Sequence, residues 1–438
     1  MNSGIDPLDS DTATLIEAYF DRLWPIMRSI TGEGVRQTHD ILSELVPLER
    51  IEIPTGTICH DWKIPQEWVV REAYVITPDG ERILDIADNN LHLVNYSIPF
   101  RGKISREDLD KHLHSIEGEP DSIPYVTSYY APIWGFCISH KMRNSLVEGE
   151  YEVVIDTDHI DGSMTMSEAV LPGSSSDEVL ISTYTCHPSM ANNELSGPLA
   201  SAFLYRHLAA LKNRKLTYRF VFIPETVGSI AYLSLRGDRM REKTVAGYVI
   251  TCVGDRAPFT YKKSQREDSL ADRAAAYVLQ RQGDGSNRIR DFFPFGSDER
   301  NYCSPGYNLP VGVLARSWPG EFSEYHSSRD NRDAISFKSI ASAADTLFEF
   351  CKVLEVNQVY ENLFPFGEPN LGRRNLMETT GAGRTRRDHI DAIKWLLNQA
   401  SGNNDLLSIA ERSGINIDKL DEAACKCLDA KLLKIASK

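Results

Sequence analysis

Apolar residues recur at helical spacing near the start of the chain, over residues 12–47, and the TGEG segment at 31–34 interrupts them. This pattern predicts two helices. Between about residues 60 and 130 the texture changes to short β-like runs (EAYVITP, ERILDI, LHLVNYSI), which turn sequences such as PDG and DNN separate. The change predicts a small β-rich domain inserted after the first helices.

From about residue 130 the chain carries longer, nearly continuous apolar runs rich in β-branched residues. Two segments between them, 196–212 and 229–242, have helical spacing. Apolar strands that alternate with helices are typical of a mostly parallel α/β sheet flanked by helices. The runs assigned to that sheet are FCISHKM, YEVVIDTDH, EVLISTYT, LTYRFVFIPE, AGYVITCVGD and NLPVGVLARS.

A segment rich in Gly, Pro and Arg follows the last amphipathic helix of the α/β part, and short helical patterns continue to the end of the chain. The Gly, Pro and Arg content is typical of a linker. The sequence therefore predicts an α/β domain formed by 1–58 and 131–363, an inserted β-rich domain at 59–130, a linker at 364–386 and a helical C-terminal domain at 387–438.

Composition and charge narrow the function classes. The formal charge is −14 over 438 residues, which argues against a surface dedicated to nucleic acid or anionic membranes. No run approaches the roughly 18–20 apolar residues that span a bilayer. The acidic N-terminal segment lacks the features of a signal peptide, and the 8 cysteines are scattered, so we expect a cytoplasmic protein with reduced thiols.

Polar clusters follow three of the predicted strands, and each contains a residue type suited to metal-assisted hydrolysis. His187 follows EVLISTYT, Glu225 follows YRFVFI, and His326 lies in the loop after VGVLARS. Ligands of open α/β sheets bind at the carboxyl ends of the strands. A catalytic zinc site uses about three nitrogen or oxygen ligands and leaves one position for water. A lone histidine or strand-end glutamate is usually structural or solvated, so the joint placement is what indicates a zinc site.

The order of these motifs resembles the zinc aminopeptidase superfamily that also contains glutaminyl cyclases. Within it, the chain is most similar to a bacterial aminopeptidase-like branch with an inserted β-domain and a C-terminal winged helix. The first metal histidine of the family matches His187, and its Glu-Glu-x-Gly motif matches 225–228. Its Ala-Asn-Asp-Asn-Ala-Ser-Gly loop is similar to 191–197, and its late Ser-Asp-His and Tyr-His-Thr-x-x-Asp segments resemble 297–299 and 325–330.

Three departures from the family pattern affect the metal site. Neutral residues occupy positions where the resemblance implies anionic ligands: Asn193, Thr226 and Thr251. We therefore expect one zinc ion per chain, held by His187, His326 and either Asn193 or Glu194. The resemblance implies that Glu225 is the general base.

Further site residues follow from the same resemblance and its surroundings. Asp298 would orient His326 or a neighbouring group. Four residues in or beside these motifs would bind substrate: Glu299, Arg300, Tyr302 and Tyr325. For Arg300 and Tyr302 the alternative is an ordinary surface loop.

The function predicted from this set is zinc-dependent hydrolysis of an amide or peptide bond in a small peptide or aminoacyl substrate. A binding or scaffold protein that kept the fold and lost the chemistry is one alternative. A DNA-binding regulator is another, but residues 384–438 carry a local charge of only about +2, where a DNA-binding face would be basic. A homo-oligomer is compatible with the sequence, and neither nucleic acid nor membrane is expected as a partner.

Overall fold

The computed structural model describes residues 10–283, 285–377 and 384–436, and it divides into two compact units. The first unit runs up to Asp272 and includes Gln282–Phe348. The second unit joins Arg273–Arg281 to the chain from Glu349 onward. None of the described helices is both long and apolar enough to cross a membrane.

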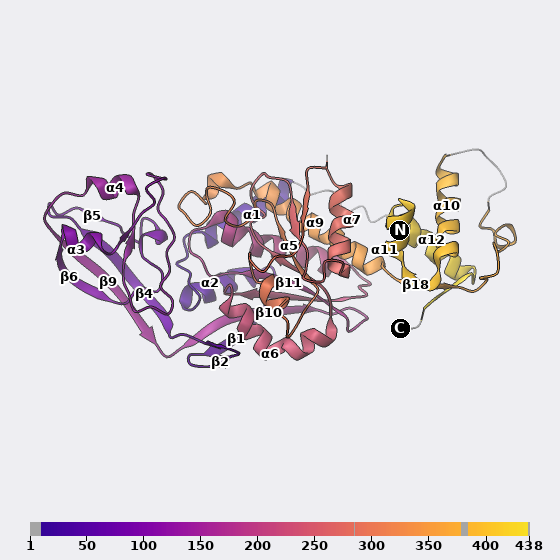
Figure 1. The fold of residues 1–438 in the computed structure, drawn as a ribbon, viewed down its shortest axis with the longest axis horizontal. Helices are drawn as coiled ribbons and strands as arrows, with labels where there is room; N and C mark the ends of the chain where they lie inside the picture. Colours follow the sequence, from indigo (N-terminus) through magenta and orange to yellow (C-terminus); the bar gives the residue numbers. More distant parts are fainter. Residues whose placement is uncertain (1–9, 284, 378–383, 437–438) are drawn as a thin grey trace. The chain divides into compact units, whose positions relative to one another are not determined.

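The first unit is built on an eight-stranded mixed sheet (Figure 1). Its four central strands are parallel neighbours, and almost all their residues are buried, as the apolar runs predicted. The strands, in spatial order, are β1 (Glu49–Pro54), β10 (Ser163–Leu171), β12 (Thr217–Ile223), β11 (Glu178–Tyr184), β13 (Thr244–Ile250), β16 (Val311–Ala315), β14 (Thr260–Lys262) and β15 (Arg288–Arg290).

Helices cover both faces of this sheet. Helix α5 (Ser196–Ala210) packs on the three strands β11, β12 and β13, and α6 (Val227–Lys243) covers the opposite face, as Figure 1 shows. The α/β class with helices on both faces is therefore confirmed. The other helices of this unit are α1 (Ser10–Leu23), α2 (Glu33–Leu42), α3 (Arg106–Asp110), α4 (His140–Ser145) and α8 (Glu299–Tyr302), while α7 (Leu270–Arg281) and α9 (Phe337–Val356) run from the first unit into the second.

A second, antiparallel sheet is inserted between β1 and β10. Its order is β5-β4-β9-β6, with β4 (Glu67–Ile76), β5 (Arg82–Ile83), β6 (Phe100–Ser105) and β9 (Glu150–Ile160). The runs at 136–142 and 151–159 were predicted for the main sheet, and both assignments are wrong: the first forms the short strand β8 and the start of α4. The second run forms β9, which pairs antiparallel with both β4 and β6. Short pairs β2 (Ile58–Cys59) with β3 (Trp62–Lys63) and β7 (Leu113–His114) with β8 (Phe136–Cys137) complete this region.

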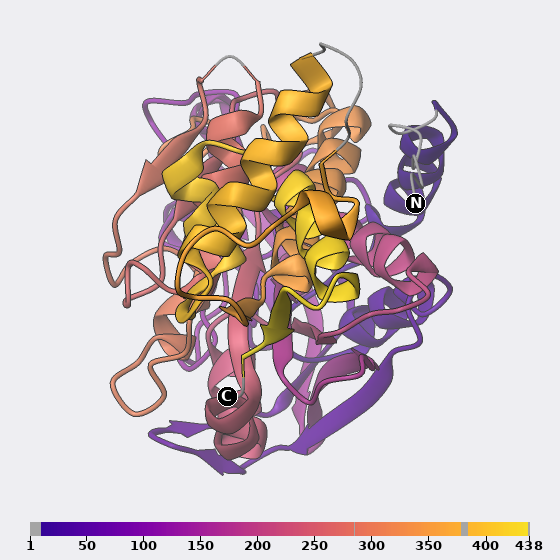
Figure 2. The same ribbon diagram turned by 90° about the vertical axis from the view of Figure 1, so that its right-hand side faces the viewer.

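The second unit ends the chain with three helices and a small antiparallel sheet, the architecture expected of a winged helix. The strands are β17 (Val359–Asn362), β18 (Ser401–Asp405) and β19 (Leu433–Ile435), and the helices are α10 (Arg384–Gln399), α11 (Leu406–Ser413) and α12 (Ile417–Asp429). Figure 2 shows these helices grouped together in yellow. Part of the predicted linker, residues 378–383, lies outside the described residues.

Candidate metal centre and active site

The three sequence clusters meet at one edge of the main sheet. Strands β12, β11, β13 and β16 are adjacent and parallel, so their carboxyl ends lie together. His187 follows β11, Glu225 follows β12, and His326 lies in the loop after β16. The main chain therefore brings the two histidines and the glutamate to the place where this class of sheet binds its ligands.

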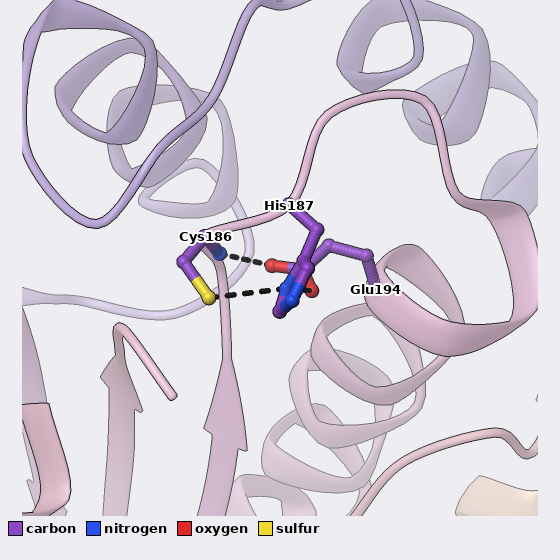
Figure 3. A group of neighbouring side chains, drawn as sticks. All are labelled: Cys186, His187 and Glu194. Carbon is purple, nitrogen blue, oxygen red and sulfur yellow. Dashed lines mark hydrogen bonds and ion pairs between the residues drawn. The ribbon is translucent and has the colours of Figure 1, made fainter. Parts of the chain in front are cut away.

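His187 is almost fully buried and has a fixed orientation. Its Nδ1 atom lies 2.7 Å from Oε2 of Glu194, whose other oxygen accepts a hydrogen bond from the backbone N–H of Cys186 (Figure 3). Burial disfavours the charged imidazole, but the Glu194 carboxylate outweighs it and raises the pKa of His187. Because Nδ1 is engaged, Nε2 is the nitrogen that faces the site, 4.0 Å from Oε2 of Glu225.

His326 lies beside His187, with 5.3 Å between the ring centroids. Tyr325 stacks on its ring at 3.9 Å, and Tyr125 approaches it edge-on at 5.4 Å. Burial and the neighbouring His187 lower the pKa of His326 to about 3, so the ring is neutral. Its Nε2 is buried and makes no hydrogen bond to any described residue. A neutral imidazole nitrogen with a free lone pair is the form that binds metal ions.

Asn193 adds a second buried atom without a partner. Its side-chain nitrogen donates to the hydroxyl of Tyr184 at 2.8 Å, and its Oδ1 makes no hydrogen bond within the described residues. Buried polar atoms are almost always satisfied in folded proteins. The orphaned Oδ1 of Asn193 and Nε2 of His326 are atoms that a bound cation would satisfy.

Glu194 was predicted as a possible metal ligand, but its contacts indicate another role. The side chains of Cys186, His187 and Glu194 form a buried group whose ligand atoms lie within 4.8 Å of one another. In that group, however, Nδ1 of His187 and both carboxylate oxygens of Glu194 already satisfy one another or the main chain. We therefore read Glu194 as the residue that orients His187, the usual partner of a metal-binding imidazole.

Glu225 lies at the start of a strained turn. The next residue, Thr226, has a φ of 63°, which is rare for a threonine and turns the chain sharply into α6. Oε1 of Glu225 accepts a hydrogen bond from the Ser297 hydroxyl at 3.3 Å. Burial raises the pKa of Glu225, and the opposing effect of His187 only partly offsets it.

Asp298 holds this turn in place. Its Oδ1 accepts hydrogen bonds from the backbone N–H of Thr226 at 2.7 Å and from the Ser229 hydroxyl at 2.8 Å, while Oδ2 makes none to a described residue. Burial raises the pKa of Asp298. Arg300 donates to Oγ1 of Thr226 at 2.8 Å from the same side. From the sequence, Asp298 was expected to orient either His326 or a neighbouring group. Its contacts are with the turn that carries Glu225, and not with His326.

Burial argues against two of the four predicted substrate-binding residues, Glu299 and Tyr302. Glu299 is fully buried and pairs with Lys262, whose Nζ also donates to the carbonyl oxygens of Phe293 and Phe295. Tyr302 is fully buried, and its hydroxyl lies 2.9 Å from that of Ser182. Their side chains point into the core and have no surface to offer a substrate. Arg300 and Tyr325 are half-buried beside the site and remain candidates.

Two site residues, Tyr125 and Tyr129, were not predicted from the sequence, and the inserted region brings them to the site. The ring of Tyr125 lies 4.9 Å from that of His187, and its backbone N–H donates to the carbonyl oxygen of His326 at 2.8 Å. The hydroxyls of Tyr125 and Tyr129 are 3.1 Å apart. The sequence signal was a cluster of aromatic residues in a segment without a regular pattern. Nothing in that cluster indicated which part of the sheet it would reach.

The positions that resemble the remaining ligands of a two-metal site carry neutral side chains that are engaged in hydrogen bonds. Oγ1 of Thr251 donates to the carbonyl oxygen of Asn193 at 3.2 Å and also contacts the hydroxyl of Tyr184. Oγ1 of Thr226 accepts from Arg300. These neutral groups give little compensation for a second divalent charge.

Two protein-family models match the chain. Residues 17–357 match the sequence model of a family described as a domain of unknown function, DUF4910, and residues 358–435 match that of a winged helix-turn-helix domain. A Clostridium acetobutylicum protein, provisionally named a polysaccharide biosynthesis protein with an aminopeptidase-like domain, is 41% identical over 426 residues, 97% of each chain.

Solved structures extend the comparison to the fold. A crystal structure of a chain from Clostridium acetobutylicum, provisionally called a peptidase, matches with a TM-score of 0.90 at 41% identity over 97% of both chains. A zinc aminopeptidase from Bacillus subtilis matches with a TM-score of 0.58 at 12% identity, over 80% of this chain and 95% of that one. An M28 peptidase precursor from Shewanella amazonensis gives 0.54 at 14%, over 79% and 93%. The zinc aminopeptidase-like fold and the C-terminal winged helix are confirmed.

Proposed function

We propose that the chain, which belongs to the DUF4910 family, is a zinc-dependent hydrolase. It would cleave an amide or peptide bond of an aminoacyl or peptide-like substrate. The observation that carries the proposal is the convergence of two imidazoles and the half-buried carboxylate of Glu225 at the carboxyl ends of neighbouring strands. Nε2 of His326 has no hydrogen-bond partner among the described residues, and Nε2 of His187 lies 4.0 Å from Oε2 of Glu225.

We propose that one zinc ion per chain is held by His187, His326 and Asn193, with Glu194 orienting His187. When bound, zinc polarises a carbonyl oxygen and lowers the pKa of water. The two imidazoles are the ligand type that zinc prefers, and Asn193 contributes a neutral oxygen. Both fit the free buried atoms of the site.

Glu225 would act as the general base. It takes the proton of the attacking water at Oε2 and returns a proton to the nitrogen of the leaving amine as the C–N bond breaks. Burial favours the protonated carboxyl group, which helps Glu225 hold the proton between the two transfers. Asp298 and Arg300 bond to the turn that carries Glu225, and the half-buried Arg300 and Tyr325 would contact a substrate.

The test is direct. Protein loaded with zinc is assayed against a panel of aminoacyl 4-nitroanilides and aminoacyl amides. We expect it to release the amine, and we expect a chelator to abolish this release. The competing function is a binding or scaffold protein on the same fold, which the neutral residues Asn193, Thr226 and Thr251 favour. Zinc-loaded protein that cleaves no member of the panel would favour that second function.

A further inference from the structure

Asp330 is a fully buried carboxylate that lies beside the candidate site. Its side-chain oxygens accept hydrogen bonds from two successive backbone N–H groups: Oδ1 accepts from Asn192 at 2.6 Å and Oδ2 from Asn193 at 2.9 Å. Its carbonyl oxygen accepts a third, from the N–H of Ala191 at 3.0 Å. One residue therefore satisfies three consecutive donors of the segment that carries the candidate ligand Asn193.

Those three donors lie at the start of a helical segment. Residues Ala191–Leu195 form a single π-helical turn that leads directly into α5. The first N–H groups of a helix have no acceptor within the helix, so a buried turn of this kind needs acceptors from elsewhere in the fold. A carboxylate supplies an acceptor oxygen to each of two neighbouring N–H groups, and its charge suits the positive end of the helix dipole.

A tight turn keeps Asp330 close to His326. The N–H of Asp330 donates to the carbonyl oxygen of Ser327 at 3.0 Å, which closes a turn that begins one residue after the histidine. The inserted region also holds this loop, because segment 123–125 pairs with 326–328. Asp330 therefore fastens the loop of one candidate ligand, His326, to the loop of another, Asn193.

The turn that carries Asn193 has two further attachments. Its side-chain nitrogen donates to the hydroxyl of Tyr184 at 2.8 Å, and Oδ1 is left without a hydrogen-bond partner among the described residues. Oδ1 of the neighbouring Asn192 accepts from the N–H of Gly254 at 2.7 Å. Metal ligands must be held within about 0.5 Å of their productive position. The backbone of Asn193 determines where its Oδ1 can lie, and Asp330 binds that backbone directly.

We propose that Asp330 is a positioning residue of the metal centre, which fixes Asn193 at the distance from His326 that zinc requires. This role rests on the proposed zinc site, in which Asn193 and His326 are ligands. Asp330 itself would not bind the metal, because both its oxygens accept hydrogen bonds from the main chain. An asparagine in its place would have a single acceptor oxygen, and its NH₂ group would face a backbone N–H. One of the two bonds would be lost and the turn would shift.

The first test measures the zinc affinity of the full chain by competition with a chromophoric chelator. Asp330→Asn should weaken zinc binding about 10–100-fold, the usual loss when a residue that supports a metal ligand is changed. The matched control is Asp272→Asn. Asp272 is equally buried and accepts from the backbone N–H groups of Ser264 and Ser269 at 2.7 and 3.1 Å, neither of which belongs to the candidate site. Its loss should lower stability and leave zinc affinity unchanged.

A second comparison asks whether Asp330 acts through Asn193. Asn193→Ala removes the ligand atom and should itself weaken zinc binding. In that background Asp330→Asn should have little further effect, because the group that it positions is gone. A residue that only stabilises the fold would lower zinc affinity equally in both backgrounds. If Asp330→Asn does not fold, Asp330→Glu takes its place, because it keeps the charge while its extra methylene group displaces the turn.

Three results would overturn the role of Asp330 and leave the proposed zinc site standing. These are wild-type zinc affinity in the Asp330 variant, an equal loss of affinity in Asp272→Asn, and a loss that is the same with and without the side chain of Asn193. Wild-type protein that binds no zinc would refute the zinc site, and this role with it.

Discussion

Nδ1 of His187 lies 2.7 Å from Oε2 of Glu194, and this contact determines which nitrogen of the imidazole faces the site. Since the carboxylate occupies Nδ1, Nε2 is directed toward Glu225 and the neighbouring His326. The arrangement has the form of a carboxylate that orients a metal-binding histidine from behind. In the proposed site, Glu194 would therefore support a metal ligand without binding the metal itself.

The role of Glu194 can be tested by changing it to glutamine. Glu194→Gln should keep the shape of the side chain but lose the charge that supports the imidazole, so we expect zinc affinity to fall about 10–100-fold. Competition with a chromophoric chelator measures this. His187→Ala is the control and should bind zinc far more weakly still. If Glu194→Gln and His187→Ala lost zinc equally, Glu194 would be a ligand.

Glu225→Gln should remove most of the hydrolysis and leave the metal in place. The amide cannot accept the proton of the attacking water, and loss of a general base costs about 10²–10⁴-fold in rate. The initial rate on the best aminoacyl substrate and the zinc content are measured on the same preparation. Asn301→Ala, a half-buried neighbour that bonds Ser229, controls for disturbance of the turn. Activity of Glu225→Gln within a few-fold of wild type contradicts the assignment.

The buried pair of Lys262 and Glu299 makes a prediction about stability. Both side chains are fully buried, and aromatic rings at 4.4 and 5.2 Å surround the ammonium group. Lys262→Met leaves an unpaired buried carboxylate and should lower the free energy of unfolding by about 3–5 kcal/mol, as urea titration would show. Adding Glu299→Gln should recover part of the loss. A double variant no more stable than Lys262→Met would refute the pairing.

Acid sensitivity is expected in the second unit, where Asp405 begins α11. Burial opposes its charge, but the hydrogen bonds to Arg273, Ser408 and Asn357 outweigh burial and hold the pKa of Asp405 well below its usual range. A lowered folded-state pKa stabilises above the unfolded value near 3.9, and the contribution disappears as pH falls toward the folded value. Asp405→Asn should therefore cost about 2–3 kcal/mol at pH 7.

Thermal unfolding at pH 7 and pH 2.5 checks this expectation. The difference between wild type and Asp405→Asn should shrink at the lower pH, while Asp429→Asn, an exposed carboxylate of the same unit, should differ little from wild type at both. A difference that stays constant with pH would show that the charge of Asp405 is not what stabilises the unit.

The main sheet was predictable because buried parallel strands are continuous apolar runs, and the residues that follow them must lie at one edge. That reasoning placed His187, Glu225 and His326 near one another before their distances were known. It failed for β9, because the apolar residues at the centre of this strand would suit either sheet. Pairing partners are decided by contacts between distant segments, which periodicity does not encode.

The errors within the site have a similar cause. Glu299 and Tyr302 follow Asp298 within four residues, and this closeness in the sequence suggested that their side chains would line the same site. The short helix α8 turns both side chains into the core, whereas Arg300 stays half-buried beside Thr226. Tyr125 and Tyr129 were missed for the converse reason. They lie far from the motifs in the sequence. A hydrogen bond from the backbone N–H of Tyr125 to the carbonyl oxygen of His326 holds their segment at the site.

The most direct test is a titration of metal-free protein with zinc, followed by the rate of hydrolysis of an aminoacyl amide. The charges at the site suit one divalent ion, since Asn193, Thr226 and Thr251 are neutral. The rate should rise in proportion to added zinc and stop rising at about one equivalent per chain. A rate that keeps rising to two equivalents, or no hydrolysis at any ratio, would contradict a single-zinc hydrolase.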